Sequence, residues 1–329
     1  YSRLWVDVAG PNLGKARTSA KIEADFRGTG SSFSVVRLRH AYLNLDWGKS
    51  ALLLGQTWHP LYGEVAPQIL NLSMGAPFQP FSRAPQIRYR FAGKHFQLTG
   101  AAVWQSQYTS QGIDPSNENK SKKSHQYLKD GCIPEFYLGA DYKNGGFLLG
   151  AGVELLSIKP RTQAEGADDQ IFKVDERLTT LSYEAHMKYT GKSVLGSNLT
   201  QASGLGGFGI KAVDERTGEQ KYTPIRFSSS WLNVVYGQKW RPGIFVGYSK
   251  NLGTPDALIS KQLYGTGTNL SQLMTAGAEL TYNLPHWKFG VEYTLSSAWY
   301  GSLNQENGKI IDSHAVCNNR IVAVAMFMF

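Results

Sequence analysis

The chain has 329 residues, of which 34 are Lys or Arg and 25 are Asp or Glu, so its formal net charge at pH 7 is +9. Hydrophobic residues make up 42% of the sequence, and it contains only two cysteines. Two cysteines cannot staple a chain this long, which excludes a small disulfide scaffold. The apolar and aromatic content argues against intrinsic disorder. The longest uncharged apolar runs fall far short of the ~18 residues that a transmembrane helix needs.

An alternation of period two dominates the sequence, and residues 18–28 show it most clearly. One face of this segment carries Ala20, Ile22, Ala24 and Phe26, and the other carries Lys21, Glu23, Asp25 and Arg27. Successive side chains of a β-strand point to opposite faces. A row of charges cannot lie in a dry core. We therefore expect one face of the strand to meet water and the other to meet an apolar medium.

The same alternation recurs at 86–91, 95–105, 181–189, 275–283 and 287–296. Four of these segments have nine to eleven residues, which is longer than the ~5–6 usual in soluble sheets and matches the ~9–11 of a membrane-spanning strand. Short connections rich in Gly, Lys and Asn alternate with long polar ones at 59–85, 108–133, 159–175, 214–224, 251–268 and 299–315. Tight turns at one end and long loops at the other predict a transmembrane antiparallel β-barrel with short periplasmic turns and long extracellular loops.

The end of the chain favours the same architecture. Ile321, Ala323, Ala325, Phe327 and Phe329 form one apolar face, and a final strand with a terminal aromatic residue looks like the signal read by the bacterial barrel-assembly machinery. Tyr and Trp near the predicted strand ends fit two aromatic girdles, although ordinary core aromatics would look alike. A β-sandwich with its charges on the outer faces is the structural alternative.

About 15 strands are visible, and residues 1–329 are predicted to form a single barrel domain. If Phe329 lies at the periplasmic rim, the first visible strand already runs toward the periplasm. Bacterial single-chain barrels have an even number of strands. We therefore expect one strand upstream of Tyr1 and about 16 strands in all.

A specific resemblance covers residues 2–89. Five segments occur in order, namely Ser2-Arg3-Leu4, Lys21-Ile22-Glu23-Ala24-Asp25-Phe26, Arg37-Leu38-Arg39-His40-Ala41-Tyr42, Gly55-Gln56-Thr57-Trp58 and Arg83-Ala84-Pro85-Gln86-Ile87-Arg88-Tyr89. This series resembles the DcaP-like porins of Gram-negative outer membranes. The resemblance implies a 16-stranded barrel, commonly a homotrimer, that takes up small anionic solutes such as dicarboxylates. Beyond residue 89, the chain is similar to the family only in its barrel pattern and its terminal Phe.

A 16-stranded barrel leaves an aqueous channel, whose selectivity depends on its width and on the charges that line it. The pore-lining candidates are Lys21, Glu23, Asp25, Arg27, Arg37, Arg39, Arg83, Arg88 and Arg90. Arginine suits carboxylates because its guanidinium is planar and bidentate, so this set predicts a preference for anions. Alternatively, Glu23 and Asp25 pair with the arginines in a lattice that merely stabilises the wall. The apolar parity changes after Arg39, which a β-bulge near residues 40–42 would explain.

The connection 59–85 differs from the other loops because it is rich in proline and apolar residues and has few charges beyond Glu64 and Arg83. A solvated loop tip would be polar. We predict that this segment folds inward and narrows the pore, with Arg83 near the constriction. The alternative is a loop that packs on a neighbouring subunit.

Other features carry less information. Lys120, Lys122, Lys123 and Lys129 could bind lipopolysaccharide phosphates or draw in anions, and a solvated loop without a role would look the same. Cys132 and Cys317 both map to the loop side and could pair or be free. The His residues are scattered without an HExxH motif, so we expect no metal, no cofactor and no catalytic site. No basic helix or RNA-binding motif accompanies the positive charge, so nucleic acid is not an expected partner.

The sequence thus predicts a passive porin in the bacterial outer membrane, in contact with its lipid and lipopolysaccharide, that prefers small anionic solutes. The alternative is a structural or assembly barrel whose lumen is plugged and which binds other envelope proteins. An open, conducting lumen would favour the first hypothesis, and a blocked lumen with a stable partner would favour the second.

Overall fold

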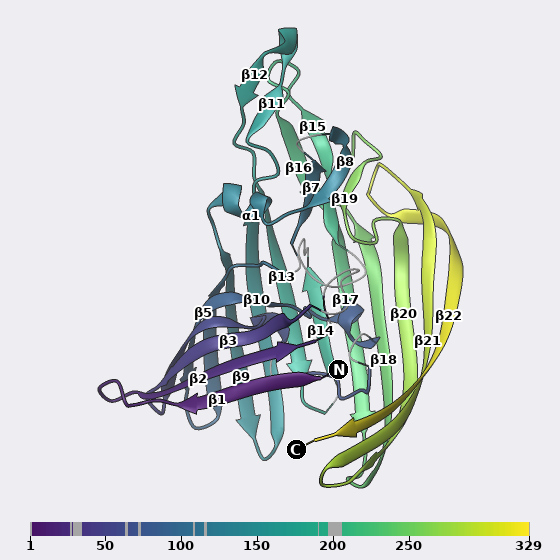
Figure 1. Cartoon of the computed structure of the whole chain (residues 1–329). Helices are drawn as coiled ribbons and strands as arrows, with labels where there is room; N and C mark the ends of the chain where they lie inside the picture. Colours follow the sequence, from purple (N-terminus) through teal and green to yellow (C-terminus); the bar gives the residue numbers. More distant parts are fainter. Residues whose placement is uncertain are drawn as a thin grey trace.

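The computed structural model describes residues 2–26, 28, 35–62, 65–71, 74–107, 109–114, 117–189, 191–196 and 206–328. Within these residues, fifteen strands form one sheet in which each strand pairs with its neighbour in chain order (Figure 1). The strands are β1 Arg3–Ala9, β2 Arg17–Asp25, β3 Arg37–Asp46, β4 Ser50–Trp58, β5 Arg83–Ala92, β6 Phe96–Val103, β9 Glu135–Asn144, β10 Phe147–Ile158, β13 Leu178–Met187, β14 Gly191–Gly196, β17 Arg226–Val235, β18 Trp240–Gly253, β20 Leu270–Asn283, β21 Trp287–Leu303 and β22 Ile310–Phe327. The predicted all-β class is confirmed.

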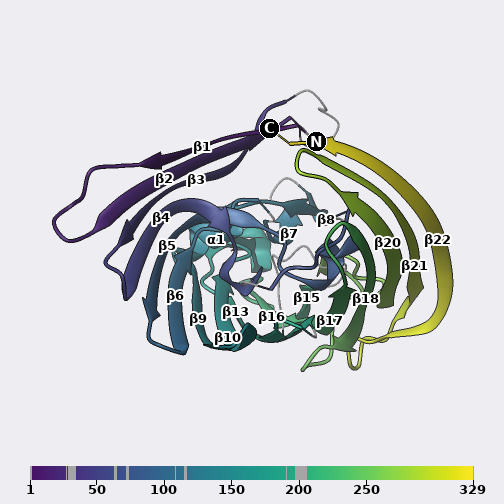
Figure 2. The same ribbon diagram turned by 90° about the horizontal axis from the view of Figure 1, so that it is seen from below.

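The sheet curls around an interior, and its two edges, β1 and β22, approach each other on one side (Figure 2). Every pairing in the ladder is antiparallel. In a ladder of fifteen alternating strands, the first and the last run in the same direction. Within the described residues, β1 pairs only with β2 and β22 only with β21. The expected sixteenth strand stays a prediction.

The long connections carry small elements that gather at one end of the sheet (Figure 1). These elements are β7 Gln111–Asp114, β8 Asn117–Lys123, α1 Gln126–Gly131, β11 Gln163–Glu165, η4 Ala167–Asp169, β12 Ile171–Lys173, β15 Gly207–Val213, β16 Gln220–Pro224 and β19 Leu263–Gly265. Ile113, Tyr127, Phe208, Tyr222 and Tyr264 belong to one buried apolar cluster that joins β7, α1, β15, β16 and β19. The loops at this end therefore have a packed core of their own. No helix among the described residues is long and apolar enough to cross a membrane.

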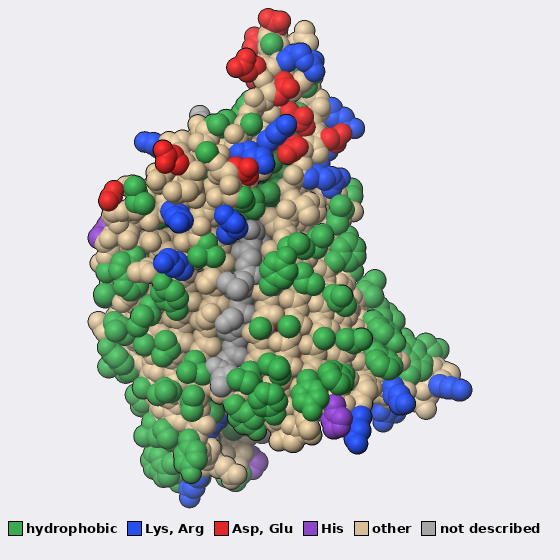
Figure 3. Space-filling model, turned by 180° about the vertical axis from the view of Figure 1, so that it is seen from behind, with side chains coloured by type: hydrophobic (Ala, Val, Ile, Leu, Met, Phe, Trp, Pro, Cys, Tyr) green, Lys and Arg blue, Asp and Glu red, His purple; other side chains and the backbone are tan. Residues whose placement is uncertain are grey.

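The outer face of the sheet is apolar, as the alternation predicts. On β9, Phe136 and Leu138 are exposed, whereas Glu135, Tyr137 and Asp141 are buried on the inner face. Figure 3 shows hydrophobic side chains spread over the outer surface, with most of the acidic side chains gathered at the end that carries the long loops. An exposed apolar surface of this extent is typical of contact with a membrane.

The predicted change of parity in β3 has a visible cause. Glu23 pairs with His40 but Ala24 pairs with Leu38, so Arg39 is an extra residue in the ladder. This β-bulge lies one residue before the range expected from the sequence. On the other side of β3, Gly55 has φ +129°, and a Cβ there would lie 2.3 Å from the Ala41 carbonyl oxygen. Only glycine fits that position.

The described residues between β4 and β5 cross the interior of the curled sheet. Their backbone N–H groups bond to side chains of distant strands: Gln68 to Asn233 Oδ1 of β17 at 2.7 Å, Leu70 to Glu279 Oε2 of β20 at 2.7 Å, and Asn71 to Glu292 Oε2 of β21 at 2.9 Å. Glu279 and Glu292 lie directly opposite each other in the β20–β21 register. Two consecutive backbone donors thus meet two neighbouring carboxylates, which fixes this segment on the wall opposite its origin.

Glycines in that wall make room for the apolar side chains of the same segment. A Cβ at Gly247 would lie 2.3 Å from the ring of Phe78, a residue of the short helix η3 (Ala76–Phe78). A Cβ at Gly277 would lie 2.5 Å from Met74 Sδ, and one at Gly290 would lie 2.7 Å from Leu70 Cδ1. Phe78 and Met74 join Val65, Ile69, Trp231 and Phe245 in one buried cluster. The wall formed by β18, β20 and β21 is therefore shaped to hold the segment.

We expect Gly247→Ala to destabilise the protein by about 1–3 kcal/mol, the usual cost of overpacking a well-packed site. The added methyl group would meet the fully buried Phe78 ring at 2.3 Å. Gly100→Ala is the matched control, because its Cβ would meet nothing closer than Tyr137 O at 4.0 Å. Urea unfolding in detergent, followed by tryptophan fluorescence, measures both. Equal midpoints for the two variants would contradict the packing described above.

Candidate functional site

A cavity of about 310 Å³ lies on the inner face of the first half of the sheet. Its charged lining residues are Arg88 and Arg90 of β5, Asp141 of β9 and His186 of β13. Pro60, from the short helix η1 (Pro60–Tyr62), also lines it. The rest of the lining comprises Ser19, Tyr42, Asn44, Ala51, Leu53, Gln97, Thr99 and Tyr137. The cavity thus lies between a mostly polar wall and the base of the segment that crosses the interior.

The two arginines of the cavity are held differently. Arg88 donates from Nε to Gln86 Oε1 at 2.9 Å and from Nη2 to the Trp58 carbonyl oxygen at 2.5 Å. Gln86 in turn donates to the carbonyl oxygens of Thr57 and Trp58, so these bonds fix the orientation of the Arg88 guanidinium. Within the part of the chain that the structure describes, Arg90 has neither a hydrogen bond nor an ion pair within 4 Å. Both guanidinium groups line the cavity.

The acid in the cavity contacts a histidine. His186 Nε2 lies 2.8 Å from Asp141 Oδ1, and Nδ1 lies 3.3 Å from Glu184 Oε2. When both acids are ionised, each ring nitrogen needs a proton to contact them, and one imidazolium then faces two carboxylates. Tyr137 donates to Glu184 Oε1 at 3.1 Å and completes the network.

The charged row predicted on β2 and β3 is paired internally. Arg37 binds Asp25 through two hydrogen bonds of 3.1 and 2.6 Å. Arg39 bonds to Glu23 at 2.5 Å and to Asp25 at 3.1 Å. Lys21 bonds to Asp7 of β1 at 3.2 Å. These contacts are the salt-bridge lattice described by the alternative interpretation of the row. Arg27 lies outside the described residues.

Arg83 lies apart from this lattice. It is buried, and its guanidinium carbon is 4.8 Å from the centre of the Trp58 ring. Trp58 also stacks on Tyr62 of the crossing segment, with ring centroids 4.6 Å apart. The structure thus separates the predicted site residues into a paired lattice on β1–β3, a stacked arginine at the start of β5, and Arg88 and Arg90 at the cavity.

The sequence interpretation missed the acidic and histidine groups of the interior. Asp141, Glu184, His186, Glu279 and Glu292 all lie on inward-facing positions of their strands. The period-two alternation was the available signal, because it places each of them opposite an apolar face. No spacing in the sequence indicates which of these strands bring their side chains together.

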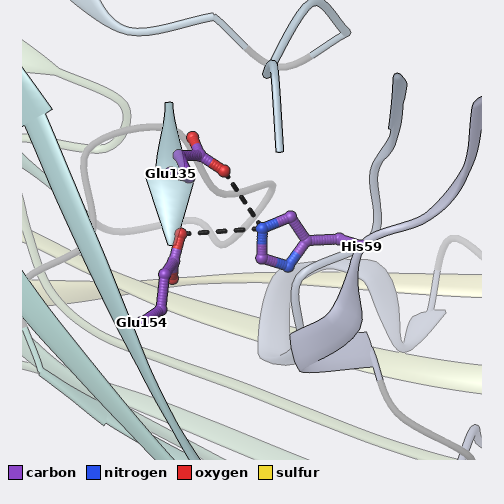
Figure 4. Close-up of side chains that lie close together, drawn as sticks. All are labelled: His59, Glu135 and Glu154. Carbon is purple, nitrogen blue, oxygen red and sulfur yellow. Dashed lines mark hydrogen bonds and ion pairs between the residues drawn. The ribbon is translucent and has the colours of Figure 1, made fainter. Parts of the chain in front are cut away.

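A second cluster lies at the base of the crossing segment and contains three possible metal ligands. His59, Glu135 and Glu154 each offer one donor atom, and all three atoms lie within 4.8 Å of one another. His59 Nε2 is 3.1 Å from Glu135 Oε2 and 3.6 Å from Glu154 Oε1 (Figure 4). However, the Leu61 backbone N–H donates to His59 Nδ1 at 3.2 Å. The ring proton then belongs on Nε2, the atom that would have to bind a cation.

The remaining predicted surface residues are exposed. Cys132, at the end of α1, and Cys317, on β22, are both free thiols. Lys122, Lys123 and Lys129 are exposed in the long connection before β9, and the side chain of Lys120 lies outside the described residues. Within the described part of the chain, no acidic side chain forms an ion pair with Lys122, Lys123 or Lys129.

Comparison with solved structures identifies the fold. OmpT, an outer membrane protein of Vibrio cholerae, superposes with a TM-score of 0.56 at 10% identity, over 99% of this chain and 89% of its own. The trimer form of the same protein gives 0.52 at 11%, over 99% and 91%. OmpF of Salmonella typhi, in complex with daunomycin, gives 0.52 at 13%, over 99% and 89%.

No family model and no curated protein sequence matches the chain. At identities this low, the structural likeness shows the fold alone. The fold is that of the transmembrane β-barrels of Gram-negative outer membranes, as the sequence predicts. The resemblance to the DcaP-like family stays a prediction.

We expect Asp25→Asn to destabilise the barrel by about 3–5 kcal/mol, because it removes one partner from a buried ion pair and leaves two guanidinium groups undercompensated. The Asp25 side chain is only 2% exposed and binds both Arg37 and Arg39. Asp7→Asn is the control, since that side chain is 61% exposed. Thermal unfolding in detergent compares the two, and a similar loss for both variants would show that burial does not govern the lattice.

Proposed function

We propose that the chain is a passive outer-membrane porin that prefers small anionic solutes. The observation that carries the proposal is the cavity lined by Arg88 and Arg90 inside a porin fold. A solute gradient drives the flux, and the protein lowers the barrier by offering a polar path through the membrane. The protein then only has to select solutes by the width and the charge of this path.

The proposed path runs between the crossing segment and the wall β2–β9. The segment packs against β17–β21, so the space left open faces the other half of the sheet, where the cavity lies. Residues 65–82 contain no Asp, Glu, Lys or Arg. The charged residues within 59–85 are therefore Glu64 and Arg83. In this proposal residues 59–85 form the constriction, and Arg88 and Arg90 on the facing wall add positive charge to it.

The charge of that wall favours anions. A unit charge about 4 Å from an arginine gains ~1 kcal/mol in bulk water and ~4 kcal/mol at an effective dielectric constant near 20. Arg88 and Arg90 are two residues apart on one strand, which places their backbones about 6.6 Å apart on the same face. Two guanidinium groups at this spacing suit a solute with two carboxylates. The resemblance to the DcaP-like porins supports the same class of solute.

We further propose a homotrimer with lipopolysaccharide around its outer rim. The trimer form of Vibrio cholerae OmpT, which shares the fold, supports this oligomeric state. The exposed lysines Lys122, Lys123 and Lys129, on the loop side, suit the phosphate groups of lipopolysaccharide.

A structural or assembly barrel with a blocked lumen is the second candidate. The packed segment between β4 and β5 and the apolar core shared by the long loops favour it, because both fill space inside or above the sheet. Planar-bilayer recordings of the purified protein separate the two functions. Stepwise current increments support the porin, and a silent protein that stays bound to an envelope partner supports the assembly barrel.

We expect the double variant Arg88→Gln, Arg90→Gln to lose most of the anion preference, measured as a shift of the reversal potential toward zero in a KCl gradient. The change removes two positive charges from the cavity wall and leaves side chains that still form hydrogen bonds. Arg17→Gln is the matched control, because Arg17 pairs with Asp46 and its side chain is 74% exposed. A wild-type channel that selects cations, or a double variant that keeps the wild-type reversal potential, would contradict the role given to these arginines.

A further inference from the structure

The segment that crosses the interior begins at His59, and this residue is completely enclosed. His59, Glu135 and Glu154 are each at most 1% exposed. His59 follows the last residue of β4, whereas Glu135 begins β9 and Glu154 lies on β10. Figure 4 shows the imidazole directed at both carboxyl groups from the opposite side of the cluster. The contact therefore joins the base of the segment to strands that are remote from it in the sequence.

The hydrogen bonds assign the proton of His59. Nδ1 accepts from the backbone N–H of Leu61 at 3.2 Å, in the manner of a cap on the helix η1. A nitrogen that accepts a hydrogen bond carries no proton. Neutral imidazole then has its proton on Nε2, which lies 3.1 Å from Glu135 Oε2. His59 is thus a neutral donor to Glu135, and each of its ring nitrogens has a defined partner.

The two carboxyl groups lie close together. One oxygen of Glu135 and one oxygen of Glu154 are within 4.8 Å of each other, and each side chain is only 1% exposed. Two negative charges this close in a buried site repel each other. A single proton on the pair removes that repulsion.

We propose that His59 and the Glu135–Glu154 carboxyl pair form a buried hydrogen-bonded latch that positions the constriction. Pro60, the next residue, lines the same cavity as Arg88 and Arg90. The middle of the segment is held by Glu279 and Glu292, so the latch fixes the beginning of the segment, beside the cavity. His59 is a positioning residue that acts on the pore through Pro60. This inference rests on the proposed porin function.

A bound cation is the competing occupant of the cluster. Metal-bound histidine usually donates its other ring N–H to an acceptor, but the Leu61 N–H faces His59 Nδ1. A cation on Nε2 would move the ring proton to Nδ1 and set two donors against each other. The hydrogen-bonded latch leaves both donors satisfied, and the geometry therefore favours it.

Two conservative variants separate the two hydrogen bonds of His59. In His59→Asn, the amide oxygen can still accept from the Leu61 N–H, but the side chain is too short to reach Glu135. In His59→Gln, the terminal amide nitrogen can reach Glu135. Because conductance follows pore width, we expect about a twofold or larger change in single-channel conductance for His59→Asn and a value near wild type for His59→Gln. Circular dichroism checks that each variant keeps its strand content.

Glu154→Gln tests this proton. A neutral amide of the same shape removes the charge of Glu154, as a proton does, so we expect wild-type conductance. Equal conductance in wild type, His59→Asn and His59→Gln would overturn the latch while leaving the porin function intact. A silent wild type would overturn the porin function itself. Block of the wild type by ZnCl₂ that disappears in both His59→Gln and Glu154→Gln would replace the latch with a cation site.

Discussion

The backbone hydrogen bonds of the curled sheet are the constraint on which the rest of the structure depends. Hydrocarbon offers no partner to a peptide N–H or C=O group, so a chain that crosses it without helices must pair its strands in a continuous ladder. Fifteen strands in unbroken antiparallel order satisfy this requirement along their shared edges. Once the ladder exists, the period of two decides which side chains meet lipid and which face the interior.

The interior is not a simple tube, because the segment between β4 and β5 divides it. Glycines at 247, 277 and 290 and the carboxylates of Glu279 and Glu292 make one wall a socket for that segment. The opposite wall carries the arginines and keeps its cavity. Two types of residue thus perform different tasks in one barrel, since glycines admit the apolar side chains of the segment on one side and arginines line the cavity on the other.

The sequence predicted the sheet far better than the site. Alternation, turn residues and strand length define the all-β class and the inward face of each strand, because both depend on local pattern. The alternation also located the bulge in β3 to within one residue, at Arg39. The partners of each inward residue depend on the strand register and on the path of the segment that crosses the interior. His186 meets Asp141 because both pair with Gly150 of β10. His59 meets Glu135 and Glu154 because the segment begins beside β9 and β10. No local pattern contains either relation.

The same distinction explains why a count of arginines is a poor guide to selectivity. On β1–β3, Arg37, Arg39 and Lys21 bond to Asp25, Glu23 and Asp7, so three positive charges meet three negative ones. At the cavity, Asp141 contacts His186, whereas Arg88 bonds to Gln86 and to the Trp58 carbonyl oxygen. A charge that is already compensated contributes little field to a passing solute. In the proposed channel, Arg88 and Arg90 of β5 supply the positive field at the cavity, and the larger row of charges beside them mainly holds the wall in shape.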